Sequence, residues 1–144
     1  MPTYLTRRVS FAAAHRYRRP EWSDEQNARV FGACARANYH GHSYTCDVTV
    51  TGAVEAATGM LIDLALLDAV LTTEVRERFD HRNINLDVPE FADGKLIPTG
   101  EELARFIFER VRLGLGDAAR VVSVIIAEDS TLSATHRDES PPPQ

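Results

Sequence analysis

The segment from His40 to Gly52 constrains the fold most, because its side chains alternate between apolar and polar over most of its length. The apolar positions are Tyr44, Cys46, Val48 and Val50, and the positions between them hold Thr45, Asp47, Thr49 and Thr51. A period of two indicates a β-strand with one buried and one exposed face. The segment opens with His40-Gly41-His42, and residues two apart on a strand point to the same side. The strand therefore presents two imidazoles together, which one metal ion can bind.

The order of the other elements predicts an α+β fold. Residues 3–15 and 120–128 are rich in β-branched and aromatic types, which indicates strands, and 131–136 predicts a short strand paired with the second of them. Ser23, Asp63 and Thr99 are typical helix N-caps and predict helices over 24–31, 63–79 and 99–113. The 63–79 helix is expected to turn one apolar stripe inward, formed by Leu64, Leu67, Leu71 and Val75. Strands first, two long helices next and a strand pair last indicate an antiparallel sheet with helices on one face.

Length, charge and hydropathy restrict the class of protein. A chain of 144 residues can bury a core as one domain, expected over 1–138, and the proline-rich end 139–144 predicts a disordered tail. The net charge of −5 argues against nucleic acid as a partner. We find no export signal and no apolar stretch near the roughly 20 residues that span a bilayer. These features predict a cytoplasmic protein without a membrane partner, with reduced thiols at Cys34 and Cys46.

A third histidine strengthens the interpretation of the pair as a metal site. His15 ends the first predicted strand, and together with His40 and His42 it makes a possible set of three neutral imidazoles. Three protein ligands and one open position are typical of a catalytic zinc ion rather than a structural one. The alternative is that the two adjacent histidines lie on a solvated strand edge.

Four further residues have side chains suited to proton transfer or ligand binding. Cys34 lies in a turn-rich segment, where a reactive thiol is more plausible than a core role. Asp80 precedes His81, and a carboxylate can fix the tautomer of an imidazole, although a histidine at a helix end can also simply stabilise the helix dipole. Glu128 follows an apolar strand and either meets solvent or anchors a ligand that donates two hydrogen bonds.

These residues lie in segments that resemble the 6-pyruvoyl-tetrahydropterin synthase family, from about Tyr4 to Asp138. Each segment is short, but their order and spacing together are specific. The matching segments are 10–15, 31–34, 40–42, 58–60 with 63–64, 80–83, 98–101 and 127–129.

The resemblance implies a role for each candidate residue. It makes His15, His40 and His42 the ligands of a zinc ion, Cys34 the proton-abstracting residue, and Asp80 with His81 the relay that serves it. Glu128 would anchor the pterin ring, with Thr99 and Glu101 nearby. The implied reaction converts 7,8-dihydroneopterin triphosphate to 6-pyruvoyl-tetrahydropterin with loss of triphosphate.

The resemblance also implies a fold of the tunnelling type and an assembly. The expected subunit has a four-stranded antiparallel sheet with two helices on one face. Subunits would form trimers that stack into homohexamers around an intersubunit barrel of strands. The active sites would lie between subunits, so the relay and the thiol of one site would come from different protomers.

Two alternatives remain open from the sequence. A related enzyme, 6-carboxy-tetrahydropterin synthase of the queuosine pathway, uses the same substrate and residue types. The longer spacing from Cys34 to His40, and the loop 87–93, favour the pyruvoyl enzyme. The other alternative is a non-catalytic homologue that only binds zinc or a pterin.

Overall fold

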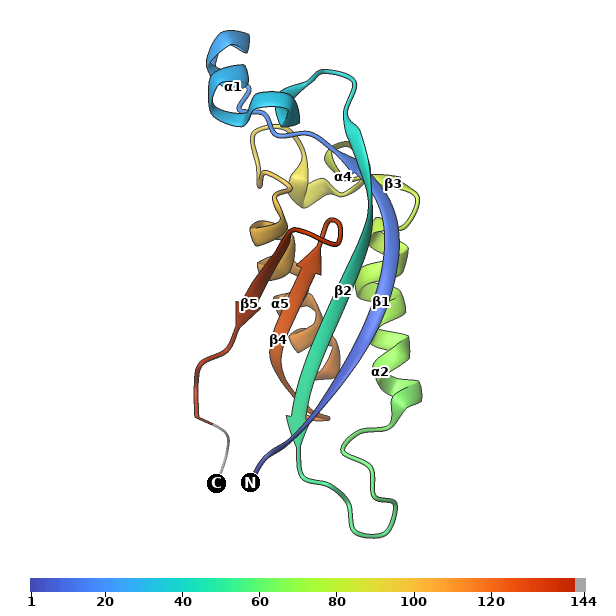
Figure 1. Ribbon diagram of the computed structural model, residues 1–144. Coiled ribbons are helices and arrows are strands. Elements are labelled where there is room, and N and C mark those ends of the chain that lie inside the picture. The colour runs from blue at the N-terminus through green and yellow to red at the C-terminus, as the bar shows by residue number, and fades with distance from the viewer. Residues whose placement is uncertain (142–144) are drawn as a thin grey trace.

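The two longest strands, β1 (Thr3–His15) and β2 (His40–Gly52), pair antiparallel over their full length and form the centre of the sheet. The computed structural model describes residues 1–141. It has an α+β architecture in which β1 and β2 cross the molecule from end to end, the two long helical segments lie behind the sheet, and the first helix lies beyond its upper end (Figure 1). β4 (Arg120–Ala127) pairs antiparallel with β2, and β5 (Ser133–Arg137) pairs antiparallel with β4.

The described sheet has five strands in the order β3-β1-β2-β4-β5, so the expected count of four is wrong. The additional strand, β3 (Arg82–Asn83), has two residues and pairs parallel with Ala13 and Ala14 of β1. It exists because the chain leaves its long helix beside β1, where the His81 amide donates to the Ala12 carbonyl at 2.7 Å. The other four strands are the antiparallel set that the sequence predicts.

Helical segments occupy the connections and cover one face of the sheet. Their bounds are α1 Asp24–Phe31, the 3₁₀ turn η1 Gly32–Ala35, α2 Leu64–Leu71, the π-turn η2 Thr72–Arg76, α3 Glu77–Phe79, α4 Ile84–Asp87, the 3₁₀ turn η3 Pro89–Phe91, and α5 Gly100–Leu115. The predicted N-caps are confirmed, since the side chains of Ser23, Asp63 and Thr99 each accept a hydrogen bond from a backbone amide in the following turn. No helix of the described chain is both long and apolar enough to cross a membrane.

The core lies between the sheet and the two long helices. The apolar positions predicted for β2 are all buried, in one core cluster with buried residues of α5 and of the continuous helix formed by α2, η2 and α3. The expected inward position of Leu64 is wrong, because its side chain is 45% exposed. Leu64 is the first residue of α2, directly after the Asp63 cap, and the buried residues of α2 are Leu67 and Leu71.

A buried carboxylate joins the two helices behind the sheet. Glu74 of η2 accepts two hydrogen bonds from Arg110 of α5, at 3.0 and 3.2 Å, and one from Arg78 at 2.9 Å. The hydrogen bond from Arg110 is the main cause that holds the pKa of Glu74 below its usual value. The carboxylate is therefore charged at neutral pH and locks the π-turn against α5.

We expect Glu74→Gln to lower the free energy of unfolding by about 1–2 kcal/mol at pH 7, because hydrogen bonds to a charged partner are lost. The pKa of Glu74 is lower in the folded state than in the unfolded state, where it is about 4.3. Its carboxylate therefore stabilises the folded protein fully at pH values above the unfolded-state pKa, and this stabilisation is lost as the pH falls through the folded-state pKa. The difference between wild type and variant, measured by urea unfolding, should therefore shrink at pH 3. Glu109→Gln breaks an exposed pair with Arg112 and serves as the control, with an expected change within about 0.5 kcal/mol. An equal Glu74→Gln effect at both pH values would contradict this account.

The end of the described chain turns back toward β4. Arg120 donates to the carbonyls of Ser140 and Pro141 and pairs with Asp138 at 3.1 Å. Residues 142–144 of the predicted tail lie outside the described residues.

Candidate metal centre and active site

The register of β1 and β2 brings three histidines together. His15 lies directly opposite His40, and His42 lies opposite Ala13, whose small side chain leaves room for the imidazole. The three ring centroids are 4.6 to 5.1 Å apart. One nitrogen from each ring can be chosen so that all three lie within 4.8 Å of one another. We call His15, His40 and His42 the histidine cluster.

The surroundings of His15 fix its free nitrogen. The ring is completely buried, and its Nδ1 donates to the Pro98 carbonyl at 2.7 Å, because a carbonyl can only accept. The hydrogen is thus on Nδ1 and the lone pair is on Nε2, 3.3 Å from the Tyr44 hydroxyl, and this tautomer is common for metal-bound histidines. Burial is the main cause that lowers the pKa of His15 to about 4, so the ring is neutral.

The other two imidazoles have the properties of metal ligands. Nε2 of His42 is buried and has no hydrogen-bond partner among the described residues, which is costly for a polar atom unless something else satisfies it. Burial, followed by the proximity of His42, lowers the pKa of His40 and favours its neutral form. Three imidazole nitrogen donors suit a borderline metal ion such as zinc, and three protein ligands leave a position open. The residues present therefore fit one such ion.

A pocket of about 320 Å³ lies beside the histidine cluster, and we call it the thiol–carboxylate pocket. It is lined by Tyr17, Phe31, Cys34, Thr99, Gly100, Glu101, Ile126, Glu128, Leu132, Ser133 and Ala134. The side chain of Glu128 is only 11% exposed, and its Oε2 lies 3.7 Å from Nε2 of His42. The carboxylate thus faces both the pocket and the cluster, rather than the open solvent that the sequence slightly favours.

Cys34 lines this pocket from the 3₁₀ turn η1, whereas Glu128 directly follows β4. Its thiol is partly buried, whereas Cys46 of β2 is completely buried, and both are free. Burial, followed by the negative charge of Glu128, raises the pKa of the Cys34 thiol. The protein groups alone therefore favour the thiol over the thiolate, and a nearby positive charge would oppose that effect.

Asp80 and His81 are not among the described residues that line the thiol–carboxylate pocket. Asp80 accepts a hydrogen bond from the Ala12 amide at 3.0 Å, and its Oδ1 lies 3.9 Å from Nε2 of His81. The side chain of His81 is 85% exposed, and its backbone has a φ of 58°, a strained value for a residue with a side chain. The pair is thus held on the edge of β1, with the imidazole directed away from its own subunit's core.

Thr99 and Glu101 both line the pocket, but their side chains differ in hydrogen bonding and in exposure. The Thr99 hydroxyl accepts from the Glu102 amide at 3.1 Å and so caps α5, while Glu101 is exposed.

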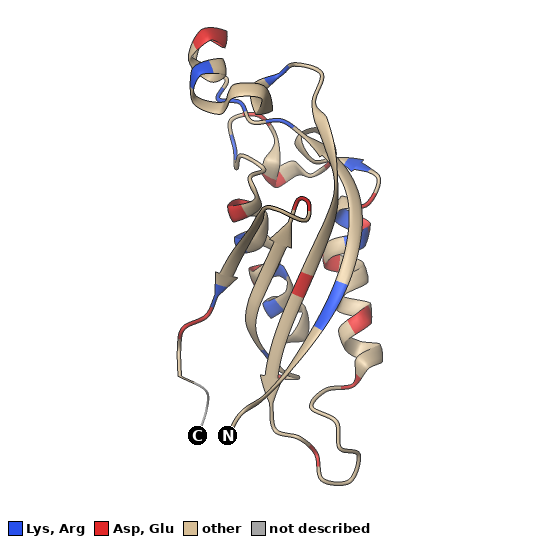
Figure 2. Ribbon diagram, viewed as in Figure 1, with Lys and Arg blue, Asp and Glu red and all other residues tan. Residues whose placement is uncertain are grey.

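The basic segment 16–19 leads from β1 toward α1 (Figure 2). Within it, Arg18 binds Asp24 at 2.7 Å and Arg19 lies 3.6 Å from Glu21. These two arginines are therefore partly neutralised by their own neighbours.

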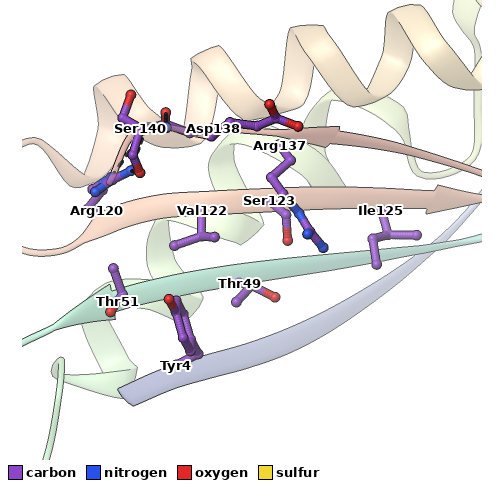
Figure 3. Close-up of a pocket in the computed structure, with 11 residues that line it drawn as sticks. Tyr4, Thr49, Thr51, Arg120, Val122, Ser123, Ile125, Arg137, Asp138 and Ser140 are labelled. Atoms are coloured by element: carbon purple, nitrogen blue, oxygen red, sulfur yellow. Dashed lines mark hydrogen bonds and ion pairs between the residues drawn. The ribbon is translucent and has the colours of Figure 1, made fainter. Parts of the chain in front are cut away.

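The outer face of the sheet has a separate hollow (Figure 3). Thr49, Thr51, Val122 and Tyr4 line it, and Arg120 closes one side through its contacts with Asp138 and Ser140. Among its described lining residues there is no histidine or cysteine. This hollow therefore contains none of the candidate site residues.

Two tyrosines contact the site and are given no site role by the sequence pattern. The Tyr17 hydroxyl donates to Oε1 of Glu128 at 3.1 Å, and the Tyr44 hydroxyl lies 3.0 Å from Nδ1 of His15. Tyr44 is predicted only as a core residue. Tyr17 lies among arginines but is two residues after His15, and that spacing was the available signal.

Comparison with known proteins gives consistent similarities. Residues 4–139 match the family described as 6-pyruvoyl tetrahydropterin synthase. The chain is 36% identical over 138 residues to 6-pyruvoyl tetrahydrobiopterin synthase of Drosophila melanogaster, which covers 96% of this chain and 81% of that protein. It is 31% identical over 111 residues to 6-carboxy-5,6,7,8-tetrahydropterin synthase of Bacillus subtilis, covering 74% of this chain and 71% of that protein.

A solved structure shares the fold. The Caenorhabditis elegans 6-pyruvoyl tetrahydropterin synthase superposes with a TM-score of 0.89 at 31% identity, covering 96% of this chain and 97% of the other.

Proposed function

The chain belongs to the 6-pyruvoyl tetrahydropterin synthase family, and on that premise we propose that it is a zinc-dependent lyase acting on 7,8-dihydroneopterin triphosphate. The product would be 6-pyruvoyl-tetrahydropterin, with release of triphosphate. The observation that carries this proposal is the histidine cluster beside a pocket that holds both a thiol and a carboxylate. A cytoplasmic setting, which keeps both cysteines reduced, is part of the same proposal.

Zinc held by His15, His40 and His42 would supply Lewis acidity toward the substrate's side-chain hydroxyls and a positive charge that favours the Cys34 thiolate. Cys34 would then remove a proton from a side-chain carbon of the substrate. His81, oriented by Asp80, would return a proton, so that the side chain is oxidised while the ring is reduced. Elimination then expels triphosphate, and no nicotinamide is needed.

Glu128 would hold the pterin ring in place during these proton transfers. An ionised carboxylate only accepts hydrogen bonds, so it suits a ligand edge with two adjacent N–H donors, which a pterin offers. The low exposure of Glu128 strengthens such bonds because little water competes for its oxygens. Thr99 and Glu101 would complete this end of the pocket.

The similarity to the Bacillus subtilis protein supports a second candidate, formation of 6-carboxy-tetrahydropterin from the same substrate. Purified, zinc-loaded protein incubated with 7,8-dihydroneopterin triphosphate would separate the candidates by the mass of the pterin product. We expect the pyruvoyl product together with free triphosphate. A carboxy product would replace the first candidate by the second, and an absence of turnover would leave only the non-catalytic homologue.

We also propose that the active site is shared between subunits of a homohexamer built from two trimers. The outer edge of β1 is unpaired over residues 3–11 in the described chain, and so is the outer edge of β5, and free edges of this kind readily pair with another chain. A neighbouring subunit could thus bring its exposed His81 to this subunit's Cys34.

Analytical ultracentrifugation at micromolar concentration tests this assembly. The expected result is a sedimenting species of six 16.0 kDa subunits, or a trimer as its half. Substituting the β5 edge residue Thr135 by proline, which cannot donate a hydrogen bond along the edge, should shift the population toward smaller species. A wild-type monomer would contradict the shared site.

A further inference from the structure

Tyr17 connects the histidine cluster to the thiol–carboxylate pocket, and the proposed reaction assigns it no part. Its backbone amide donates to the carbonyl of Cys34 at 2.8 Å. Its hydroxyl donates to Oε1 of Glu128 at 3.1 Å, and all three residues line the pocket. One residue therefore contacts both the segment that bears the thiol and the carboxylate that follows β4.

The ring of Tyr17 is held by aromatic contacts on two sides. It packs edge-on against His15, with centroids 5.1 Å apart and planes at 77°, and against Phe31 at 5.9 Å and 78°. With the backbone bond to Cys34, these contacts leave the side chain little freedom to turn. The hydroxyl position is thus set by the fold before any ligand enters.

The hydroxyl can only act as a donor in this position. The hydroxyl points its hydrogen at Oε1 of Glu128 at 3.1 Å, and a phenol ordinarily carries that hydrogen at neutral pH. Its partner is a carboxylate, which has no proton to offer when ionised. The direction of the bond, from Tyr17 to Glu128, is therefore fixed.

The other oxygen of Glu128 is directed differently. Oε2 lies 3.7 Å from the imidazole Nε2 of His42, beyond hydrogen-bond distance, and Oε1 keeps one lone pair after accepting from Tyr17. A carboxylate on a flexible side chain could rotate among several orientations. A bond to one oxygen from a rigid phenol selects one of them and so reduces the ordering cost of binding.

We propose that Tyr17 is a positioning residue whose hydroxyl orients the Glu128 carboxylate to accept two hydrogen bonds from the amidine edge of a pterin. This inference rests on the proposed function, because the proposed substrate supplies the pterin that Glu128 would bind. The alternative is a purely structural role, in which the buried phenol needs a hydrogen-bond acceptor, Glu128 provides it, and ligand binding is unaffected.

Tyr17→Phe distinguishes these two roles, because it keeps the ring contacts and the backbone bond to Cys34 and removes only the hydroxyl. We expect the KM for 7,8-dihydroneopterin triphosphate to rise about tenfold, the scale of one hydrogen bond to a charged group, with kcat changed less than about threefold. The affinity for neopterin, measured by fluorescence titration, should fall by the same factor. Zinc content should be unchanged. Tyr4→Phe, on an exposed tyrosine at the far end of β1, is the matched control.

A double-mutant cycle tests whether Tyr17 acts through Glu128. Glu128→Gln alone should weaken neopterin binding more than Tyr17→Phe does, because the charged acceptor is lost. Adding Tyr17→Phe to Glu128→Gln should then weaken binding by clearly less than tenfold, since the group that Tyr17 positions has already been changed. Independent, multiplying effects would assign Tyr17 a separate structural role and overturn the proposal.

The outcomes also separate this inference from the proposed function. If the wild type turns over the substrate, and Tyr17→Phe has the same KM and the same affinity for neopterin, the positioning role is overturned and the lyase remains. If the wild type binds neopterin but shows no turnover, and Tyr17→Phe binds neopterin about tenfold more weakly, the positioning role is supported and the lyase is overturned. A wild type that neither binds neopterin nor releases triphosphate from the substrate overturns both.

Discussion

Replacing His40 by alanine is expected to abolish stoichiometric zinc binding and, with it, turnover. The variant leaves two imidazoles, His15 and His42, in place of three. Losing even an outer-shell partner costs about 10–100-fold in metal affinity, so the loss of a direct ligand should exceed about 100-fold. The fold should survive, because His40 is only half-buried at the end of β2 and takes no part in the core. Zinc per chain after gel filtration, measured by plasma mass spectrometry, is the direct readout.

His136 provides the control for this experiment. It lies on β5 with its ring 5.0 Å from that of Phe108, away from the cluster, and its replacement by alanine should leave the zinc content at the wild-type value. One zinc per chain retained in His40→Ala would show that His40 is not a ligand. Loss of zinc in His136→Ala would show that the metal site lies elsewhere than at the histidine cluster.

Cys34→Ala is expected to reduce kcat about 10²–10⁴-fold while zinc binding and assembly remain normal, the range that a positioned proton-transfer group contributes. Cys34 is partly exposed in a short 3₁₀ turn, so its truncation removes little packing. Neopterin should still bind, because the substitution leaves Glu128 and its hydrogen bond from Tyr17 in place. Single-turnover triphosphate release, compared with neopterin affinity in the same preparation, separates lost chemistry from lost binding.

Cys46 is the matched cysteine control. Its thiol is completely buried in β2, and burial raises its pKa to about 12, so it has no thiolate at neutral pH. Cys46→Ala should cost about 1–2 kcal/mol of stability through a small cavity and leave kcat within about twofold. Full activity in Cys34→Ala would show that the thiol takes no part in the reaction.

The strands and long helices could be predicted because their signals are local. The alternation over 44–51 and the caps at Asp63 and Thr99 each lie within one element, and the structure has the elements they predict. β3 could not be predicted, since a two-residue strand has no periodicity and exists only because His81 meets Ala12. The exposure of Leu64 depends on where along the helix burial in the core begins, which a helical period alone does not encode.

The candidate site could be predicted only in part, for a related reason. The His-Gly-His spacing places His40 and His42 on one side of a strand, but the meeting with His15 depends on the register of two strands joined by the long connection 16–39. No turn type fixes that register from the sequence. The contact between Tyr17 and Glu128 joins residues 111 positions apart, and Tyr17 lies in a segment dominated by arginine. Such contacts become visible only when the whole sheet is assembled.

The measurement that tests the central claim most directly is triphosphate release from 7,8-dihydroneopterin triphosphate by one wild-type preparation in three states. The states are zinc-loaded, stripped with a chelator, and stripped then resupplied with zinc. The account predicts release by the first and third states and a loss of at least about 100-fold in the second, with the fold unchanged by circular dichroism. Zinc-loaded protein that leaves the substrate intact, or stripped protein that releases triphosphate at the same rate, would contradict it.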